Sequence, residues 1–135
     1  MILADTNVWN EAAKPNGARK IVQWTEDNRN QLWLSTIVIA EIRAGIENPE
    51  AERRRAGLEI WLKRLEVLNA ERILAFDTGA AYVLGKLLIA KPQQNNMLDN
   101  VLAAQALSRD CAIAMRNVKH FELTGVKLVN PWDIG

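Results

Sequence analysis

The chain has very few of the side chains that build thiol or imidazole sites. Its 135 residues include one cysteine and one histidine. Because Cys111 lies alone in the apolar stretch CAIAM, one chain can form neither a disulfide framework nor a cysteine-based metal site, which suits a reducing cytoplasm. His120 follows Lys119 at a predicted turn, a position typical of a surface or hydrogen-bonding histidine. His120 is therefore not a candidate site residue.

The chain also lacks a strong net charge and long apolar runs. Its formal net charge is +1, so any contact with nucleic acid must come from a local patch. The obvious patch, Arg53-Arg54-Arg55, has glutamates around it, a pattern typical of a solvated helix face. The first acid stands at position 5 and the apolar runs are short, which excludes a recognisable signal peptide or membrane-spanning helix. We expect a soluble cytoplasmic protein with no membrane partner.

Strand-like and helix-like patterns alternate along the chain. Its length predicts one domain that buries roughly two-thirds of its unfolded surface. Short apolar runs predict strands at residues 1–4, 32–34, 73–76, 112–115 and 127–129. Helical periodicity predicts helices around Ile21 and Trp24, and over residues 37–46, 58–65, 80–90 and 98–108. This alternation predicts an α/β fold with a mostly parallel sheet covered on both faces, and a helical hairpin over residues 37–68.

Polar residues and prolines mark the ends of these elements. Residues 91–96, KPQQNN, predict a loop. The predicted helix caps are Ser35 or Thr36, and Asp77. Near the C-terminus, Pro131 is expected to end the last strand and Trp132 to seal an edge of the core.

The N-terminal stretch MILADTNVW ends an apolar strand on an acid, Asp5. Thr6 and Asn7 follow with the small polar side chains of a turn. A carboxylate at the carboxyl end of a central strand lies where open α/β sheets bind ligands. The alternative is that Asp5 caps the next helix through a side-chain oxygen, and these nine residues alone favour the cap.

A second acid, Glu41, lies on the apolar side of its predicted helix. On a helical wheel it falls with Ile37 and Ala44, nearly opposite Arg43. Gly45, one turn later, has no side chain and leaves room for a ligand to approach.

A third acid, Asp99, also faces inward on the wheel, among Leu102, Ala103 and Ala106. The residues predicted to form the solvent-facing side of the same helix are Asn100, Gln105, Ser108 and Arg109.

Three inward carboxylates need compensation, because an ionised carboxylate is costly to bury without a partner. The helix faces that carry Glu41 and Asp99 hold no base, and Arg116 is the only arginine near the end of a predicted strand. Hard oxygen ligands suit Mg²⁺ or Mn²⁺, which keep several waters and bind a few carboxylates plus a substrate phosphate. Ordinary buried ion pairs are the alternative.

Four separated stretches resemble a PIN domain of the VapC toxin type, in its FitB-like and plasmid-stability branch. They are ILADTNV, STIVIAEIRAGI, LDNVLAAQAL and MRNVKHFELTGVKLVNPW, in the family's order from residue 1 to residue 132. The resemblance implies a single PIN domain over residues 1–135 with a three-layer α/β/α sandwich. It also implies the toxin of a type II toxin-antitoxin system: an endoribonuclease that uses Mg²⁺ or Mn²⁺, is usually a homodimer, and is held inactive by a VapB-like antitoxin.

The same resemblance assigns roles to residues. The implied catalytic residues are Asp5, Glu41, Asp99 and Asn117, with Asp5 and Asp99 as metal ligands. Thr6 and Asn7 would orient the first acid and a bound water, and Arg116 would hold the loop or meet phosphate. Two departures are Met115, where a small hydroxyl residue is usual, and Asn100, which follows Asp99 in place of a small residue.

The tryptophans and other apolar residues of the helices favour core and dimer contacts. Tryptophans could stack RNA bases, but Trp24 and Trp61 lie on apolar helix faces typical of core or dimer contacts. The apolar residues between positions 20 and 65 exceed what one small core needs and favour a homodimer.

Two rival functions remain. A haloacid-dehalogenase-like phosphatase would need a second acid where this chain has Asn7. The stronger rival is a regulatory subunit with little nuclease activity, which reaches operator DNA only through its antitoxin.

Overall fold

The central sheet has the five strands that the sequence predicts, with nearly the same bounds. The computed structural model describes residues 1–90 and 96–134, without the side chains of His120 and Leu123. The strands are β1 (Ile2–Ala4), β2 (Leu32–Ser35), β3 (Ile73–Leu74), β4 (Ala112–Ala114) and β5 (Lys127–Val129). They lie in the order β3-β2-β1-β4-β5, and every neighbouring pair is parallel.

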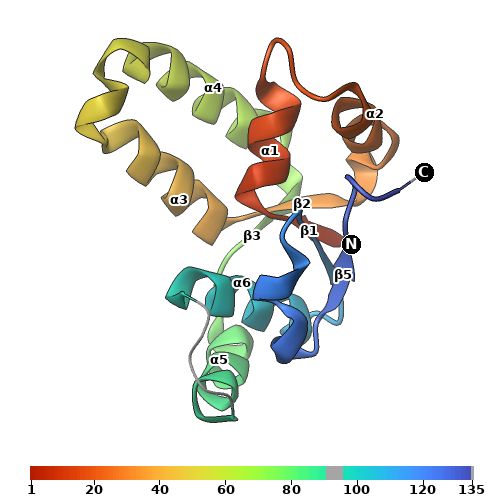
Figure 1. Cartoon of the computed structure of the whole chain (residues 1–135). Helices are drawn as coiled ribbons and strands as arrows, with labels where there is room; N and C mark the ends of the chain where they lie inside the picture. Colours follow the sequence, from red (N-terminus) through yellow and green to blue (C-terminus); the bar gives the residue numbers. More distant parts are fainter. Residues whose placement is uncertain (91–95, 135) are drawn as a thin grey trace.

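Helices cover both faces of this sheet, as predicted. The α-helices are α1 (Thr6–Ala13), α2 (Arg19–Asp27), α3 (Thr36–Glu47), α4 (Arg55–Leu68), α5 (Thr78–Ala90) and α6 (Met97–Ser108). Short 3₁₀ helices are η1 (Arg29–Gln31), η2 (Pro49–Arg54), η3 (Ala70–Arg72), η4 (Val118–His120) and η5 (Glu122–Thr124). Figure 1 shows α1 and α2 on one side of the sheet and α5 and α6 on the other, with the α3–α4 hairpin projecting to the side. The predicted three-layer α/β/α fold and the hairpin are confirmed.

The helix missing from the predicted set is α1. It begins at Thr6, where the sequence indicates a turn, and Asp5 is its N-cap. The Asp5 Oδ1 accepts a hydrogen bond from the Thr6 backbone N–H at 2.8 Å. Val8 and Trp9 are buried, and the indole N–H of Trp9 donates to the Ala4 carbonyl at 3.0 Å. Residues that resemble a turn therefore start a helix here, because the helix buries two large side chains immediately.

Both predicted caps of the later helices are confirmed. The Ser35 Oγ accepts a hydrogen bond from the Ile37 backbone N–H at 3.0 Å, at the start of α3. The Asp77 Oδ1 accepts one from the Ala80 backbone N–H at 2.9 Å. This hydrogen bond is the main cause that holds the pKa of Asp77 below its ordinary value, and the charge of Arg109 acts in the same direction.

The predicted solvent-facing side of α6 is confirmed for Arg109, which is exposed, and wrong for Asn100 and Gln105. Asn100 is 5 % exposed and Gln105 is 1 % exposed. The helix contacts α5, β4 and α3, so residues 100–106 are buried on every side. The buried amide of Gln105 is hydrogen-bonded on both sides. Its Nε2 donates to the Leu74 carbonyl at 3.2 Å, and its Oε1 accepts a hydrogen bond from the Ser35 Oγ. A polar residue inside this helix therefore joins α6, α3 and β3.

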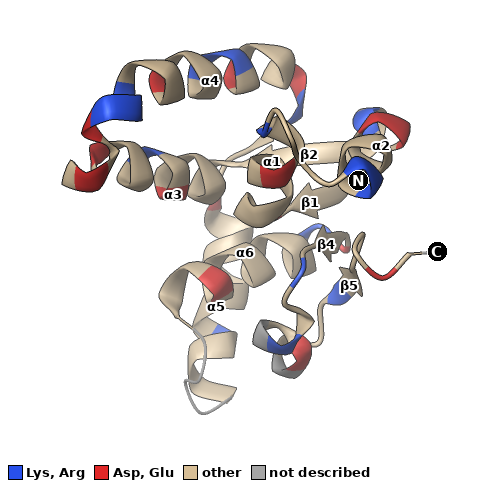
Figure 2. Ribbon diagram, turned by 45° about the horizontal axis from the view of Figure 1, so that its top comes forward, with Lys and Arg blue, Asp and Glu red and all other residues tan. Residues whose placement is uncertain are grey.

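The basic run Arg53-Arg54-Arg55 in the hairpin is only partly exposed to solvent. Figure 2 shows basic and acidic residues alternating along the hairpin, and Arg53 and Arg54 are exposed. Arg55 is half-buried, and its guanidinium donates to the carbonyl oxygens of Ile46 at 2.8 Å and Asn48 at 3.1 Å. Arg55 therefore closes the hairpin, which the charge pattern alone did not indicate.

The C-terminal segment behaves as the sequence predicts. Pro131 is fully buried just beyond β5, and Trp132 is half-buried against the core. The loop expected over residues 91–96 lies, apart from Asn96, outside the described residues. In the described part of the chain, no helix combines the length and the apolar character needed to cross a membrane.

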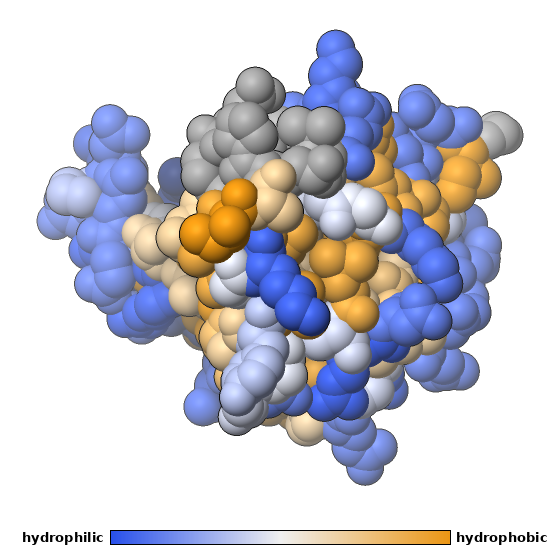
Figure 3. All heavy atoms as spheres, turned by 90° about the horizontal axis from the view of Figure 1, so that it is seen from below, coloured by the Kyte–Doolittle hydropathy of each residue, from blue (hydrophilic) through white to orange (hydrophobic). Residues whose placement is uncertain are grey.

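An exposed apolar surface covers α5 and the start of α6. Only Ala80 of the α5 residues is buried. The exposed large apolar side chains are Tyr82 (74 %), Ile89 (89 %), Met97 (54 %) and Leu98 (39 %). Figure 3 shows apolar side chains gathered on the face seen from below. By contrast, the apolar residues between positions 20 and 65 mostly belong to the core or pack against it, Trp24 and Trp61 included.

The buried link between Ser35 and Gln105 predicts a stability effect. Ser35→Ala removes the cap of α3 and leaves the Gln105 amide short of a partner inside the core. We expect a loss of about 2 kcal/mol in the free energy of unfolding, measured in urea. The control is Ser108→Ala on α6, where the hydroxyl bonds only to the Gln105 carbonyl in its own helix, with an expected change within about 0.5 kcal/mol. Equal losses in both variants would contradict this role of Ser35.

Candidate active site

The site begins at the carboxyl ends of two neighbouring strands, β1 and β4. The chain leaves β1 toward β2 on one side, while β4 lies on the other, so the order of the strands reverses here. Such a reversal is where open α/β sheets bind ligands. Asp5 directly follows β1, and its backbone N–H donates to the Ala114 carbonyl of β4 at 2.8 Å. Asp5 is therefore fixed at the reversal point, while Asn117 lies exposed just after β4.

The structure confirms that Asp5 is a helix cap, and this cap does not exclude a place in a site. The side chain caps α1 through Oδ1, as the nine N-terminal residues favour. A carboxylate has two oxygens and about four acceptor positions, so a cap leaves the same side chain capable of further contacts. The charge of Asp5 also acts on a second acid of the predicted site, Glu41. Capping and a place in an acidic site are therefore compatible.

Glu41 shows that the three predicted acids lie within one electrostatic neighbourhood. Burial is the main cause that raises its pKa above the ordinary glutamate value, and the charges of Asp5 and Asp99 raise it further. The Thr6 Oγ1 donates a hydrogen bond to the Glu41 Oε1 at 3.1 Å, which acts in the opposite direction. The acids come from the end of β1, from α3 and from α6. The charges of Asp5 and Asp99 therefore disfavour loss of the Glu41 proton, as like charges do in one site.

The donor atoms around these acids are of the type that hard cations prefer. The Oδ1 of Asn7 is buried and has no hydrogen-bond donor among the described residues. Amide and carboxylate oxygens are the usual protein ligands of Mg²⁺, which retains several waters. Within residues 1–90 and 96–134, no three His, Cys, Asp or Glu side chains form a ready-made ligand cluster. The oxygen atoms of these acids and of Asn7 are donors of the kind that would suit such a cation together with several waters.

A groove of about 840 Å³ runs from these residues along α1 and the α3–α4 hairpin. Of the predicted site residues, it is lined by Thr6, Asn7, Glu41 and Arg116. Gly45 also lines it, and a Cβ placed there would meet nothing within 4 Å, so its absent side chain leaves open space as predicted. Met115, the first departure from the family pattern, is fully buried and points into the core.

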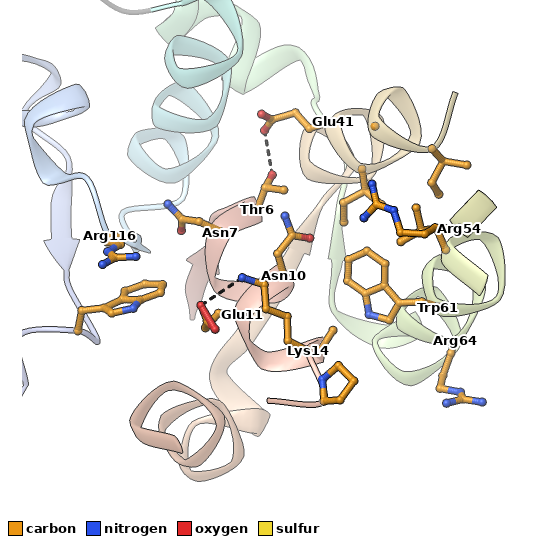
Figure 4. A pocket seen from close by; sticks show the side chains of 17 residues that line it. Thr6, Asn7, Asn10, Glu11, Lys14, Glu41, Arg54, Trp61, Arg64 and Arg116 are labelled. Atoms are coloured by element: carbon orange, nitrogen blue, oxygen red, sulfur yellow. Dashed lines mark hydrogen bonds and ion pairs between the residues drawn. The ribbon is translucent and has the colours of Figure 1, made fainter. Parts of the chain in front are cut away.

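The groove also contains residues that the sequence did not single out for the site. They are chiefly Lys14, Arg54, Trp61, Arg64 and Trp132. Figure 4 shows Arg54, Trp61 and Arg64 on the hairpin side and Arg116 beside Asn7. Trp61 follows the apolar period of its helix, and nothing in that period distinguishes a core residue from a groove residue.

A profile of the PIN domain family matches residues 2–125. The chain belongs to the PIN domain family. It is 34 % identical to the plasmid stability protein StbB of Pseudomonas syringae pv. tomato, over 98 % of this chain and 99 % of that protein. It is 33 % identical to the VapC ribonuclease Y4jK of Sinorhizobium fredii, again over 98 % and 99 %.

Two solved structures of similar proteins have the same fold. A crystal structure of FitAcB from Neisseria gonorrhoeae superposes with a TM-score of 0.86 at 29 % identity and covers 99 % of this chain and 100 % of that one. A structure of FitAB bound to an IR36 DNA fragment has a TM-score of 0.80 at 26 % identity and covers 100 % and 98 %. The resemblance to VapC and FitB toxins found in the four sequence stretches is therefore confirmed.

The raised pKa of Glu41 predicts how stability depends on pH in this PIN domain without metal. The folded state holds the Glu41 proton more tightly than the unfolded chain does. The free energy of unfolding therefore falls as pH rises from the ordinary glutamate pKa through the raised one. With chelator present, Glu41→Gln should melt above the wild type at pH 7, and the difference should shrink as the pH is lowered toward the ordinary value.

The matched control is Glu47→Gln on the same helix. Glu47 is exposed and pairs with Arg43, so its neutralisation should not raise the melting temperature at pH 7. A Glu41→Gln protein that melts below the wild type at pH 7 in chelator would show that the carboxylate is stabilised rather than repelled by its surroundings.

Proposed function

We propose that this PIN domain is the toxin of a type II toxin-antitoxin system and hydrolyses RNA with the help of Mg²⁺ or Mn²⁺. The observation that carries the proposal is the approach of three acids from the end of β1, from α3 and from α6, close enough for the charges of Asp5 and Asp99 to act on the half-buried Glu41. Relatives support it, because one is named a VapC ribonuclease. Clustered acids of this kind are typical of functional sites.

Each site residue has a task in this reaction. Asp5 and Asp99 would hold the cation, with the unpartnered Oδ1 of Asn7 turned to its water shell. When bound, the cation supplies positive charge to the phosphodiester under attack. Glu41 would accept the proton of the attacking water, since its raised pKa makes it a better base near neutral pH. Thr6 orients Glu41 through its hydrogen bond, while Asn117 completes the polar edge after β4.

The groove suits an antitoxin peptide as the inhibitor of this site. Its floor includes Ile42, Ile46 and Trp61, and one end opens on Glu41. An extended peptide with an apolar anchor and an Arg or Lys aimed at the acids would match both features. Solved structures of FitAcB and DNA-bound FitAB support such a partner, and operator DNA would be reached only through it.

Metal dependence tests the ribonuclease proposal. Titration of Mg²⁺ or Mn²⁺ into chelated protein should raise both RNA cleavage and the melting temperature, because a ligand bound only by the folded state stabilises it. Asp5→Asn should reduce cleavage at least about a hundredfold. Asparagine still caps a helix and removes one of three like charges, so the variant should melt no lower than the wild type in chelator.

Three outcomes would count against this assignment. Full cleavage in excess chelator would remove the metal from the mechanism. Wild-type cleavage by Asp5→Asn would remove Asp5 from the site. Absence of RNA cleavage by the wild type at any metal concentration, together with operator binding by the antitoxin complex, would favour the regulatory subunit instead.

The exposed apolar surface of α5 supports a homodimer, and we propose it as the contact face. Sequence reasoning favoured residues 20–65, but those side chains mostly belong to the core, whereas Tyr82 and Ile89 are exposed on α5. Exposed apolar patches of this kind commonly mark protein interfaces. By light scattering at micromolar concentration, the wild type should be a dimer and Ile89→Glu a monomer. Ile60→Glu, an equally drastic change at an exposed site on α4, should remain dimeric.

A monomeric wild type, in a sample shown to be folded, would contradict the homodimer. Dissociation by Ile60→Glu and not by Ile89→Glu would move the contact from α5 to α4.

A further inference from the structure

The tail segment Asn130-Pro131-Trp132 holds Arg116 at two points. The Asn130 side-chain amide donates to the backbone carbonyl of Arg116 at 3.2 Å. The guanidinium carbon of Arg116 lies 5.4 Å from the centroid of the Trp132 ring, within the range of a cation–π contact. This segment follows residue 125, where the match to the family profile ends.

The tail is itself firmly anchored. Pro131 is fully buried, and the Asn130 Oδ1 accepts a hydrogen bond from the Trp132 backbone N–H at 3.0 Å. The Trp132 carbonyl accepts a hydrogen bond from the Lys20 Nζ of α2 at 2.8 Å. Backbone contacts on both sides therefore fix the indole that lies against Arg116.

Arg116 is placed where a substrate would pass. It lines the same groove as Asn7 and Glu41, and its side chain is exposed. Figure 4 shows it beside Asn7, across α1 from Arg54 and Arg64. In the described part of the chain no carboxylate pairs with Arg116. A ring contact uses the flat face of the guanidinium and leaves its N–H edge available, and that edge is what binds phosphate in a bidentate manner.

We infer that Arg116 binds a phosphate of the RNA beside the acids, and that Trp132 and Asn130 are positioning residues that hold Arg116 ready for it. The inference rests on the proposed ribonuclease function. An arginine side chain loses considerable rotamer freedom when it binds, and a guanidinium already held on a ring loses less. The simpler role of Trp132, to seal an edge of the core, would not require any effect on Arg116.

A double-mutant cycle separates these roles. The probe is a fluorescein-labelled single-stranded RNA of mixed sequence, bound to Asp99→Asn protein in Mg²⁺ so that cleavage is suppressed, with affinity measured by anisotropy over a range of salt. Arg116→Ala should weaken binding about tenfold and reduce the salt slope by about 0.7, the value of one phosphate contact on a single strand. Trp132→Leu should weaken binding about two- to fivefold when Arg116 is present and not at all beside Arg116→Ala.

Conservative and control variants complete the test. Trp132→Phe keeps an aromatic face and should restore most of the affinity lost in Trp132→Leu. Asn130→Ala, which frees the Arg116 carbonyl, should weaken binding in the same Arg116-dependent way. Trp24→Leu changes another half-buried tryptophan that lies outside the groove and should lower stability without changing RNA affinity. Arg53→Ala removes an exposed arginine outside the groove and should leave affinity within about twofold.

Three results would overturn the inference. A Trp132→Leu effect of the same size with and without Arg116 would make Trp132 a structural residue only. The absence of any RNA binding by the Asp99→Asn protein, or an unchanged salt slope in Arg116→Ala, would remove the phosphate contact of Arg116. Failure of the ribonuclease proposal has a different signature, namely wild-type protein that binds RNA through Arg116 and does not cut it in Mn²⁺.

Discussion

The partial burial of Glu41 beside the carboxylates of Asp5 and Asp99 is the constraint on which the rest of the structure depends. The three acids come from the end of β1, from α3 and from α6, and burial first, then the charges of the other two, raise the pKa of Glu41. Elements that carry like charges would drift apart unless other contacts held them. The interaction of these acids therefore lowers the free energy of unfolding of the metal-free protein, as is common for residues that serve a binding site rather than the fold.

Buried polar contacts supply the opposing force. Gln105 joins the Ser35 cap of α3 to the Leu74 carbonyl of β3, and the backbone of Asp5 is bonded to Ala114 of β4. Ser35 and Gln105 stand less than two helical turns from Glu41 and Asp99 on their respective helices. Breaking any hydrogen bond of a buried polar network costs much free energy, because the groups left behind have no water to bond to. The hydrogen bonds of Ser35 and Gln105 therefore hold the two acid-bearing helices at a defined separation.

Local signals in the sequence predicted most of the fold and singled out Asp5, Glu41 and Asp99, whose charges interact in the structure. The strands and five of the α-helices follow from apolar periodicity, but α1 did not, because Asp5, Thr6 and Asn7 serve equally well as a turn or as a helix start. The helical wheel of α6 wrongly placed Asn100 and Gln105 on the solvent-facing side. A polar residue predicts exposure only where one side of the helix contacts solvent, and residues 100–106 are all buried. The rest of the groove depends on how the hairpin and the tail fold back toward α1, which no local pattern contains.

The near-neutral net charge does not mean that the groove is uniformly neutral. Glu41 lines the groove and is acted on by the charges of Asp5 and Asp99, whereas Arg54, Arg64 and Arg116 line the same groove without carboxylate partners among the described residues. Three carboxylates repel a phosphodiester until their charge is neutralised, while the arginines attract it at any metal concentration. Under the proposed ribonuclease function, RNA affinity and cation affinity would therefore depend on one another, and this dependence would be reciprocal. An arginine held in place near Glu41 would then let RNA bind in register before the acids themselves favour it.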